Sequence, residues 1–69
     1  MPKLRVFSGA ELCALLEQHG FQKVRQRGSH VVMRGGSVSF PVPLHRELDR
    51  GTLSGIIRQS GLPRELFMS

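Results

Sequence analysis

The sequence predicts an α+β domain of order α-β-β-β-α, in which two helices pack on one face of a three-stranded antiparallel sheet. Three observations support this prediction. A capping residue followed by an apolar stripe of helical spacing occurs near each end of the chain. Two glycine-containing turns separate runs of alternating residues in the middle. The chain has 69 residues, which is enough for one domain, 1–69.

The first predicted helix covers about residues 9–19. Ser8 and Glu11 have the spacing of a capping box, in which each side chain accepts a hydrogen bond from the other residue's backbone amide. Gly20 supplies the C-terminal stop. Phe21 is expected to anchor the junction with the sheet, because strict alternation would place it on the basic face of the next strand. The stripe of this helix carries Leu12, Leu15, Leu16 and His19, with Ala10, Cys13 and Ala14 nearby.

Residues 22–42 predict three antiparallel strands joined by two tight turns. Gly28-Ser29 is predicted to form a two-residue hairpin loop, because glycine occupies the first central position that a type II′ turn requires. The second turn is predicted at Gly35-Gly36. The resulting register pairs Arg27 with His30, Gln26 with Val31, Arg25 with Val32, Val24 with Met33, Lys23 with Arg34, Ser37 with Arg34, Val38 with Met33 and Phe40 with Val31.

This register sorts the strand residues onto two faces. The predicted core face carries Val24, Val31, Met33, Val38, Phe40 and Val42. The other face carries Lys23, Arg25, Arg27, His30, Arg34, Ser37 and Ser39. Because the helices cover the first face, the second is predicted to be an open cationic surface that holds one histidine.

The C-terminal part predicts a second helix after a charged loop at 43–51. Pro41 and Pro43 cannot donate to a strand ladder, so the third strand is expected at a sheet edge or to end there. Asp49 can cap a helix over about 50–60, which Gly61 ends. Its stripe is Leu53, Ile56 and Ile57, and a further turn at 62–67 is expected to return Leu66 and Phe67 to the core. Residues 1–7 are expected to form a short basic arm, frayed at its start.

Composition points to a polyanionic partner. Ten Lys and Arg against five Asp and Glu give a net charge of +5. In so small a domain this excess favours nucleic acid as the binding partner. The single cysteine, Cys13, excludes an internal disulfide and a multi-cysteine metal site. The sequence contains neither an apolar run of membrane-spanning length nor a stretch long enough for a secretory signal, so we expect a cytoplasmic protein without a membrane partner.

His30 is the candidate catalytic residue. An imidazole can take the proton of the ribose 2′-OH, and neighbouring cations can neutralise the phosphate, so RNA could be cleaved without a metal. Arg25, Arg27 or Lys23 would hold the phosphate, and Ser29 could bond the turn backbone or a phosphate. The alternative interpretation is a surface histidine at a hairpin.

Two further histidines are candidates for a role. His45 follows the third strand and could be a second proton shuttle or a loop residue that bonds local backbone, whereas His19 suits the helix C-terminus. His45, Glu47 and Asp49 alternate, so in an extended chain they would point the same way and could form a metal site. However, acidic residues before a helix are ordinary capping chemistry. We therefore predict no metal and no cofactor.

The residues also resemble a known family. The blocks Gly20-Phe21, 24–30, 42–45 and 51–62, in this order and spacing, are similar to HicA toxins, the small mRNA-cleaving partners of HicB antitoxins. The resemblance implies a fold like that of double-stranded RNA-binding domains. It also implies ribosome-independent cleavage of mRNA in which the histidine of the Gly-Ser-His block, His30, is essential. Two departures are the short loop at Gly35-Gly36 and Arg58, where a lysine is common.

The resemblance further implies a type II toxin–antitoxin pair, in which a HicB-like antitoxin covers the site and a higher-order complex binds its own operator. Two alternatives stay open: a non-catalytic RNA-binding module of the same fold, and a basic subunit that only docks its antitoxin. The residues expected to contact RNA are Lys23, Arg25, Arg27, Ser29, Arg34 and His45.

Overall fold

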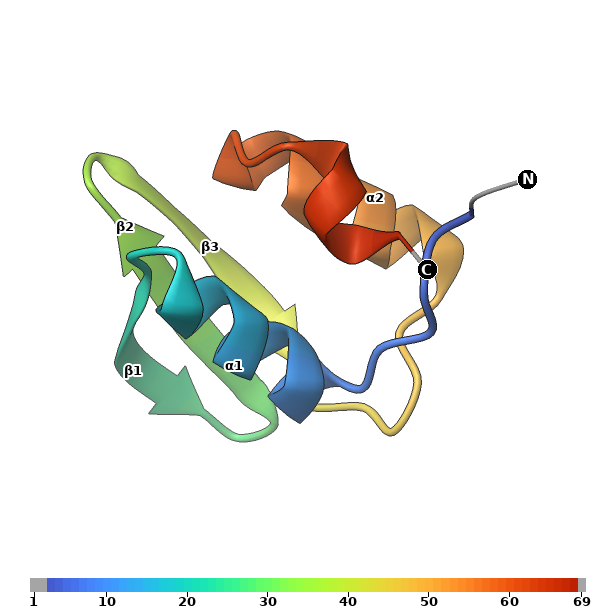
Figure 1. Cartoon of the computed structure of the whole chain (residues 1–69). Coiled ribbons are helices and arrows are strands. Elements are labelled where there is room, and N and C mark those ends of the chain that lie inside the picture. The colour runs from blue at the N-terminus through green and yellow to red at the C-terminus, as the bar shows by residue number, and fades with distance from the viewer. Residues whose placement is uncertain (1–2, 69) are drawn as a thin grey trace.

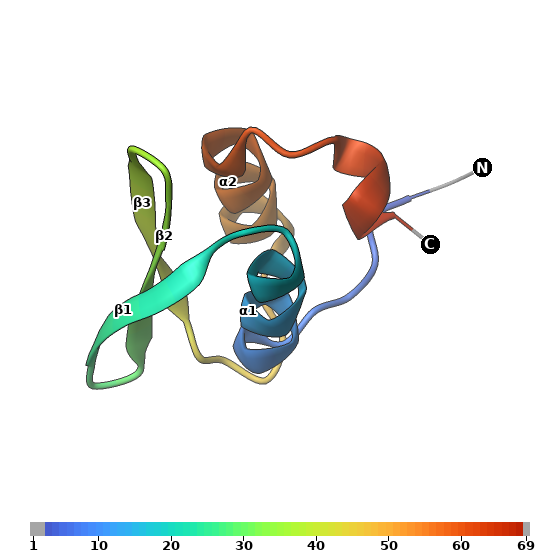
Figure 2. The same ribbon diagram turned by 60° about the vertical axis from the view of Figure 1, so that its left-hand side comes forward.

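The computed structural model describes residues 3–68, and the expected fraying of residues 1 and 2 lies outside this range. The predicted α-β-β-β-α order is confirmed (Figure 1). The elements are α1 (Gly9–Gln18), β1 (Gln22–Arg27), β2 (His30–Gly35), β3 (Val38–Pro43), α2 (Arg50–Ser60) and the 3-10 helix η1 (Arg64–Phe67). The sheet order is β1-β2-β3, so β3 is an edge strand as predicted. Both helices lie on the same side of the sheet (Figure 2).

Helix α1 begins and ends as its sequence predicts. The Ser8 hydroxyl accepts from the Glu11 amide at 3.0 Å, and Glu11 Oε1 accepts from the Ser8 amide at 2.9 Å. At the other end Gly20 has a φ of +95°, and the Phe21 amide donates to the Leu16 carbonyl at 3.0 Å. This is the Schellman arrangement, which brings the apolar side chain after the glycine back against the last turn. Phe21 is consequently buried at the junction, as expected.

Helix α2 also follows its prediction. Asp49 Oδ1 accepts from the Thr52 amide at 2.7 Å, and this hydrogen bond lowers the pKa of the Asp49 carboxyl. Gly61 ends the helix in the left-handed conformation with a φ of +71°. Leu53, Ile56 and Ile57 are buried as the predicted stripe. No helix in residues 3–68 combines the length and apolar character that crossing a lipid bilayer requires.

The two ends of the described chain meet on the side of the helices away from the sheet (Figure 2). Leu4 forms a β-bridge with Met68, and the Arg5 amide donates to the Phe67 carbonyl at 2.9 Å. Phe7 and Phe67 are both almost fully buried and pack edge to face, with ring centroids 6.2 Å apart. The predicted basic arm therefore contributes Phe7 to the core, and Leu4 packs against it.

The second hairpin turns one residue later than predicted. Glycine and serine again occupy its two central positions, Gly36-Ser37, and Gly36 has a φ of +61° while Ser37 does not have a positive φ. Gly35 pairs with Val38, and Met33 pairs with Phe40. The predicted pairing of β2 with β3 is thus wrong by two positions. Because side chains alternate with a period of two, this slip leaves every residue on its predicted face.

Strand β1 contains a β-bulge that the alternation did not predict. Arg25 pairs with Val32 as expected, but Lys23 rather than Val24 pairs with Met33. Two corrections follow. Val24 is not in the core but is 51% exposed, and Lys23 does not share the face of His30. The extra residue reverses the alternation for everything that precedes it in the strand.

The physical reason for the bulge is Phe21. Without it, alternation would point this side chain away from the helices; with it, Phe21 is only 6% exposed and its ring centroid lies 5.5 Å from that of Phe40. A phenylalanine ring removes more apolar area from water than a valine side chain does, so burying Phe21 at the cost of exposing Val24 is favourable. Gly35 faces the same ring so closely that a Cβ there would lie 2.8 Å from Phe21 Cδ2. This contact keeps Gly35 in the strand and leaves the turn to Gly36-Ser37.

Val38 is the second predicted core residue that is exposed, and it is the first residue of β3 after the turn. The remaining predicted core positions of the sheet are buried, and with the helices and the arm they form one cluster. Its members in the sheet are Val31, Met33, Phe40 and Val42.

Candidate functional site

The face of the sheet opposite the helices, here called the open face, consists of three rows that cross the strands. Because Val31, Met33, Phe40 and Val42 are buried against the helices, the residues that alternate with them point the other way. In order from the first turn, the rows are Arg27–His30–Pro43, Arg25–Val32–Pro41 and Gln22–Arg34–Ser39.

The open face belongs to the most cationic part of the chain. Residues 22–43 contain four of the ten Lys and Arg and none of the five Asp and Glu. Three of these cations, Arg25, Arg27 and Arg34, lie in the three rows, and all are exposed. Such a surface attracts an anion along its whole length and offers no carboxylate that would repel it.

His30 lies in the row next to the first turn. Gly28, with a φ of +56°, makes this turn, and Arg27 is the direct pair of His30 as predicted. Pro43 pairs with His30 on the other side, so the strand neighbours of His30 are an arginine and a proline. The side chain of His30 is exposed, which leaves it accessible to a substrate.

Backbone hydrogen bonds connect this end of the sheet to α1. The Leu44 amide donates to the Ser29 carbonyl at 2.6 Å, and the Gly9 amide donates to the His45 carbonyl at 2.9 Å. A Cβ on Gly9 would overlap the Pro43 carbonyl oxygen and lie 2.7 Å from Leu44 Cα. The first turn of α1 therefore sets where the 43–45 segment lies beside His30.

The chain matches a known protein family over most of its length. Residues 9–62 match a family model described as the HicA toxin of bacterial toxin–antitoxin. This chain belongs to the HicA toxin family. The match runs from the first residue of α1 to just past the end of α2, so it covers the whole sheet and both helices. No curated protein and no solved structure gives a significant match. As a HicA-family member, the protein is the toxin of a toxin–antitoxin system.

The structure brings together some of the residues predicted for the site of this HicA-family toxin and separates others. Arg25, Arg27 and Arg34 share the open face with His30, and Ser29 lies in the adjoining turn. Lys23 instead pairs with Met33 on the helix side. Its charge acts there on the Cys13 thiol, whose pKa burial raises and Lys23 partly lowers. Lys23 is thus a predicted phosphate ligand that lies on the face of the sheet opposite to His30.

His45 follows β3 as predicted, but at a different register. Pro43 rather than Pro41 is opposite His30, so His45 comes two residues rather than four after the strand partner of His30. The His45 carbonyl accepts a hydrogen bond from the Gly9 amide. The His45 side chain is exposed, and after the hydrogen bonds from Thr52 it also contributes to the lowered pKa of the Asp49 carboxyl. Its roles as proton shuttle and RNA contact stay predictions. In residues 3–68 no three His, Cys, Asp or Glu side chains gather as a metal ion requires, His45, Glu47 and Asp49 included.

The sequence does not predict that Gln22 lies on the open face or that Val24 is exposed. The bulge places Gln22 opposite Arg34 and exposes Val24. The sequence contains a signal for this, because Phe21 conflicts with strict alternation and a bulge can re-aim the side chains of a strand.

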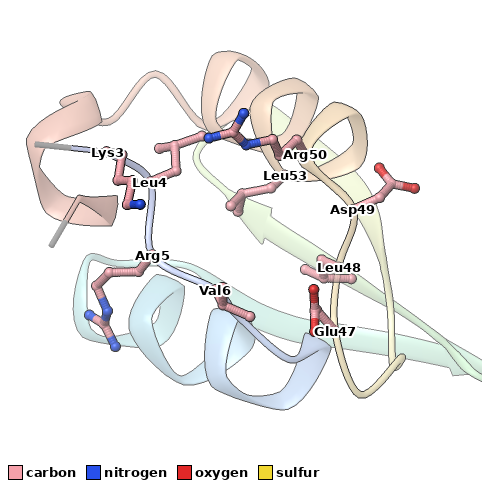
Figure 3. A pocket seen from close by; sticks show the side chains of 9 residues that line it. All are labelled: Lys3, Leu4, Arg5, Val6, Glu47, Leu48, Asp49, Arg50 and Leu53. Atoms are coloured by element: carbon pink, nitrogen blue, oxygen red, sulfur yellow. The ribbon is translucent and has the colours of Figure 1, made fainter.

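A separate hollow of about 300 Å³ lies between the N-terminal arm and the start of α2 (Figure 3). Its lining mixes cations with carboxylates and contains no histidine. The residues are Lys3, Leu4, Arg5, Val6, Glu47, Leu48, Asp49, Arg50 and Leu53. None of the predicted site residues is among them, so the candidate chemistry of this HicA-family toxin lies on the open face.

Replacing Gly9 by alanine tests the connection between α1 and the 43–45 segment. The new methyl group has no room against the Pro43–Leu44 backbone, so we expect a loss of about 1–3 kcal/mol in the free energy of unfolding. Gly51→Ala is a matched control, because Gly51 also lies in the first turn of a helix and its nearest contact would be an ordinary 3.6 Å. Urea denaturation measures both variants, and an equal stability of the two would contradict the proposed connection.

Proposed function

We propose that this HicA-family toxin is an endoribonuclease that cleaves mRNA without a metal ion, with His30 as general base. The observation that carries this proposal is the position of His30: exposed, directly paired with Arg27, and on a cationic face without a single carboxylate. RNA supplies both the phosphate that such a face attracts and the hydroxyl that an imidazole can deprotonate.

The reaction needs little from the protein. His30 takes the proton of the ribose 2′-OH, and the 2′-oxygen attacks the adjacent phosphorus. The bond to the 5′-oxygen breaks, and this oxygen takes a proton from solvent, which reaches the exposed site. The products are a 2′,3′-cyclic phosphate and a 5′-hydroxyl end. A positioned base of this kind typically contributes about 10²–10⁴-fold to the rate.

Arg27 and Arg25 are the residues that would stabilise the phosphate. Negative charge accumulates on the phosphoryl oxygens as the 2′-oxygen attacks, and a guanidinium presents parallel N–H donors to two such oxygens. Arg27 shares a row with His30, and Arg25 lies in the next row of the open face. Ser29 precedes His30 in the turn, and its hydroxyl can donate a hydrogen bond to the same phosphate.

The antitoxin partner is proposed to be a HicB-like protein that acts in the cytoplasm and covers the open face. A cover over His30 and its arginines would block both RNA binding and proton transfer. Charge favours an acidic contact surface on that partner, because the open face contains only cations among its charged side chains. A higher-order toxin–antitoxin complex on its own operator belongs to the same proposal.

A single 2′-deoxy substitution tests the proposed chemistry. The cleavage positions of the purified toxin on a defined RNA are mapped first, and the nucleotide that precedes one scissile phosphate is then replaced by its 2′-deoxy form. We expect cleavage to stop at that position, to continue elsewhere, and to be insensitive to EDTA. Cleavage that persists at the deoxy position would show that the 2′-OH is not the nucleophile.

A non-catalytic RNA-binding module is the second candidate. The arginines of the open face would bind phosphate without any help from His30. This alternative predicts salt-sensitive RNA binding with no cleavage products. A subunit that only docks its antitoxin would differ from both, because it would not shift RNA at low salt.

A further inference from the structure

A hollow of about 380 Å³ lies at the end of the sheet far from His30. It is lined by Gly20, Gln22, Val24, Arg34 and Gly36. Gln22 and Arg34 form the third row of the open face, so this hollow, here called the Val24 hollow, adjoins the surface on which His30 lies. Its volume falls in the range of small-molecule sites.

Val24 is the one aliphatic side chain among the residues that line the hollow. At the bulge in β1 this side chain is outside the core and 51% exposed, and it lines the same hollow as Gln22 and Arg34. Gly20 and Gly36 flank the hollow and add no side chains that would fill it. An exposed aliphatic side chain in an open, unobstructed position provides a contact for a flat apolar ring.

The polar groups of the hollow suit the rest of a nucleotide. Arg34 is held at the rim, because its Nε donates to the Gly36 carbonyl at 3.4 Å and its terminal nitrogens stay available for a phosphate. Gln22, directly opposite, has an amide that both donates and accepts hydrogen bonds. Such an amide can pair with the edge of an unpaired base.

The distance to His30 fits a subsite on the same strand of RNA. His30 and Arg34 are four residues apart on β2, which corresponds to about 13 Å at ~3.3 Å per residue. A single-stranded segment of a few nucleotides spans this length. Only unpaired bases expose the edges and faces that the Val24 hollow could contact.

We propose that the Val24 hollow is a nucleotide subsite that binds an unpaired base a few nucleotides away from the bond cleaved at His30 and so selects where the RNA is cut. This inference rests on the proposed endoribonuclease function. It adds Val24 and Gln22 as specificity-determining residues and assigns Arg34 to a phosphate remote from the reacting one.

The test compares Val24→Ala and Gln22→Ala with wild type. Cleavage positions are mapped on a single-stranded RNA of mixed sequence, and kcat and KM are measured on one strongly cut site. We expect KM to rise about fivefold, as loss of one base contact implies, with a flatter preference among sites and kcat within threefold. Val6→Ala is the control, since Val6 is also an exposed valine but lies on the N-terminal arm.

The outcomes separate this inference from the proposed function. If the folded variants keep the wild-type cleavage pattern and KM, the Val24 hollow is not a subsite, although the nuclease proposal stands. If wild type does not cleave at all, the subsite is tested instead by the Kd values of wild type and the three variants for an uncleavable 2′-deoxy oligonucleotide. Weaker binding by Val24→Ala and Gln22→Ala but not Val6→Ala supports the subsite, and equal binding overturns it.

Discussion

Replacing His30 by alanine is expected to reduce RNA cleavage by about 10²-fold or more and to abolish growth inhibition. The side chain is exposed and makes no contribution to the core, so stability should change by no more than about 0.5 kcal/mol. RNA binding should survive, because Arg25 and Arg27 are untouched. Single-turnover cleavage, a filter-binding Kd and a thermal melt measure the three quantities.

His19→Ala is the matched control for this experiment. His19 is likewise an exposed histidine, but it caps α1 and lies outside the open face. It should leave cleavage unchanged. His45→Ala, made in parallel, decides whether the second histidine near the turn takes part in proton transfer. Full activity of a folded His30→Ala protein would rule out His30 as the base and return the open face to the role of a binding surface.

Replacing Gly35 by alanine is expected to cause one of the largest losses of stability that a single methyl group can produce in this protein. The new Cβ would lie 2.8 Å from two carbons of the Phe21 ring. This ring packs against Phe40, and the Phe21 backbone amide donates to the Leu16 carbonyl. Overpacking of this kind costs about 1–3 kcal/mol. In a domain of this size each kilocalorie lowers Tm by about 4–8 °C.

Gly55→Ala is the control for that substitution. Gly55 lies inside α2, and a Cβ there would meet nothing within 4 Å. Alanine should stabilise this helix by about 0.5–1 kcal/mol, because it removes conformational freedom from the unfolded chain. Thermal melts of both variants give opposite shifts if the packing against Phe21 is as described. A Gly35→Ala protein as stable as wild type would mean that the Phe21 ring moves aside at no cost.

The local signals in the sequence predicted the features that depend on a few neighbouring residues. The capping box at Ser8 and the Asp49 cap begin the helices where expected, and the Gly28-Ser29 turn pairs Arg27 with His30. Each of these depends on hydrogen bonds and backbone angles within about four residues. The position of His30 on the open face follows from the same turn, so the residue at the centre of the proposed chemistry was placed correctly by sequence alone.

Packing between distant segments decided the rest. Phe21 must reach Phe40 and Gly35, and this demand puts a bulge in β1, moves Lys23 to the helix side and exposes Val24. The same contact shifts the second turn by one residue. Local propensity could not decide these points, because the competing registers differ little in their own hydrogen bonds. They differ in whether a large aromatic ring is buried, and that free energy exists only when the helix and the whole sheet are assembled.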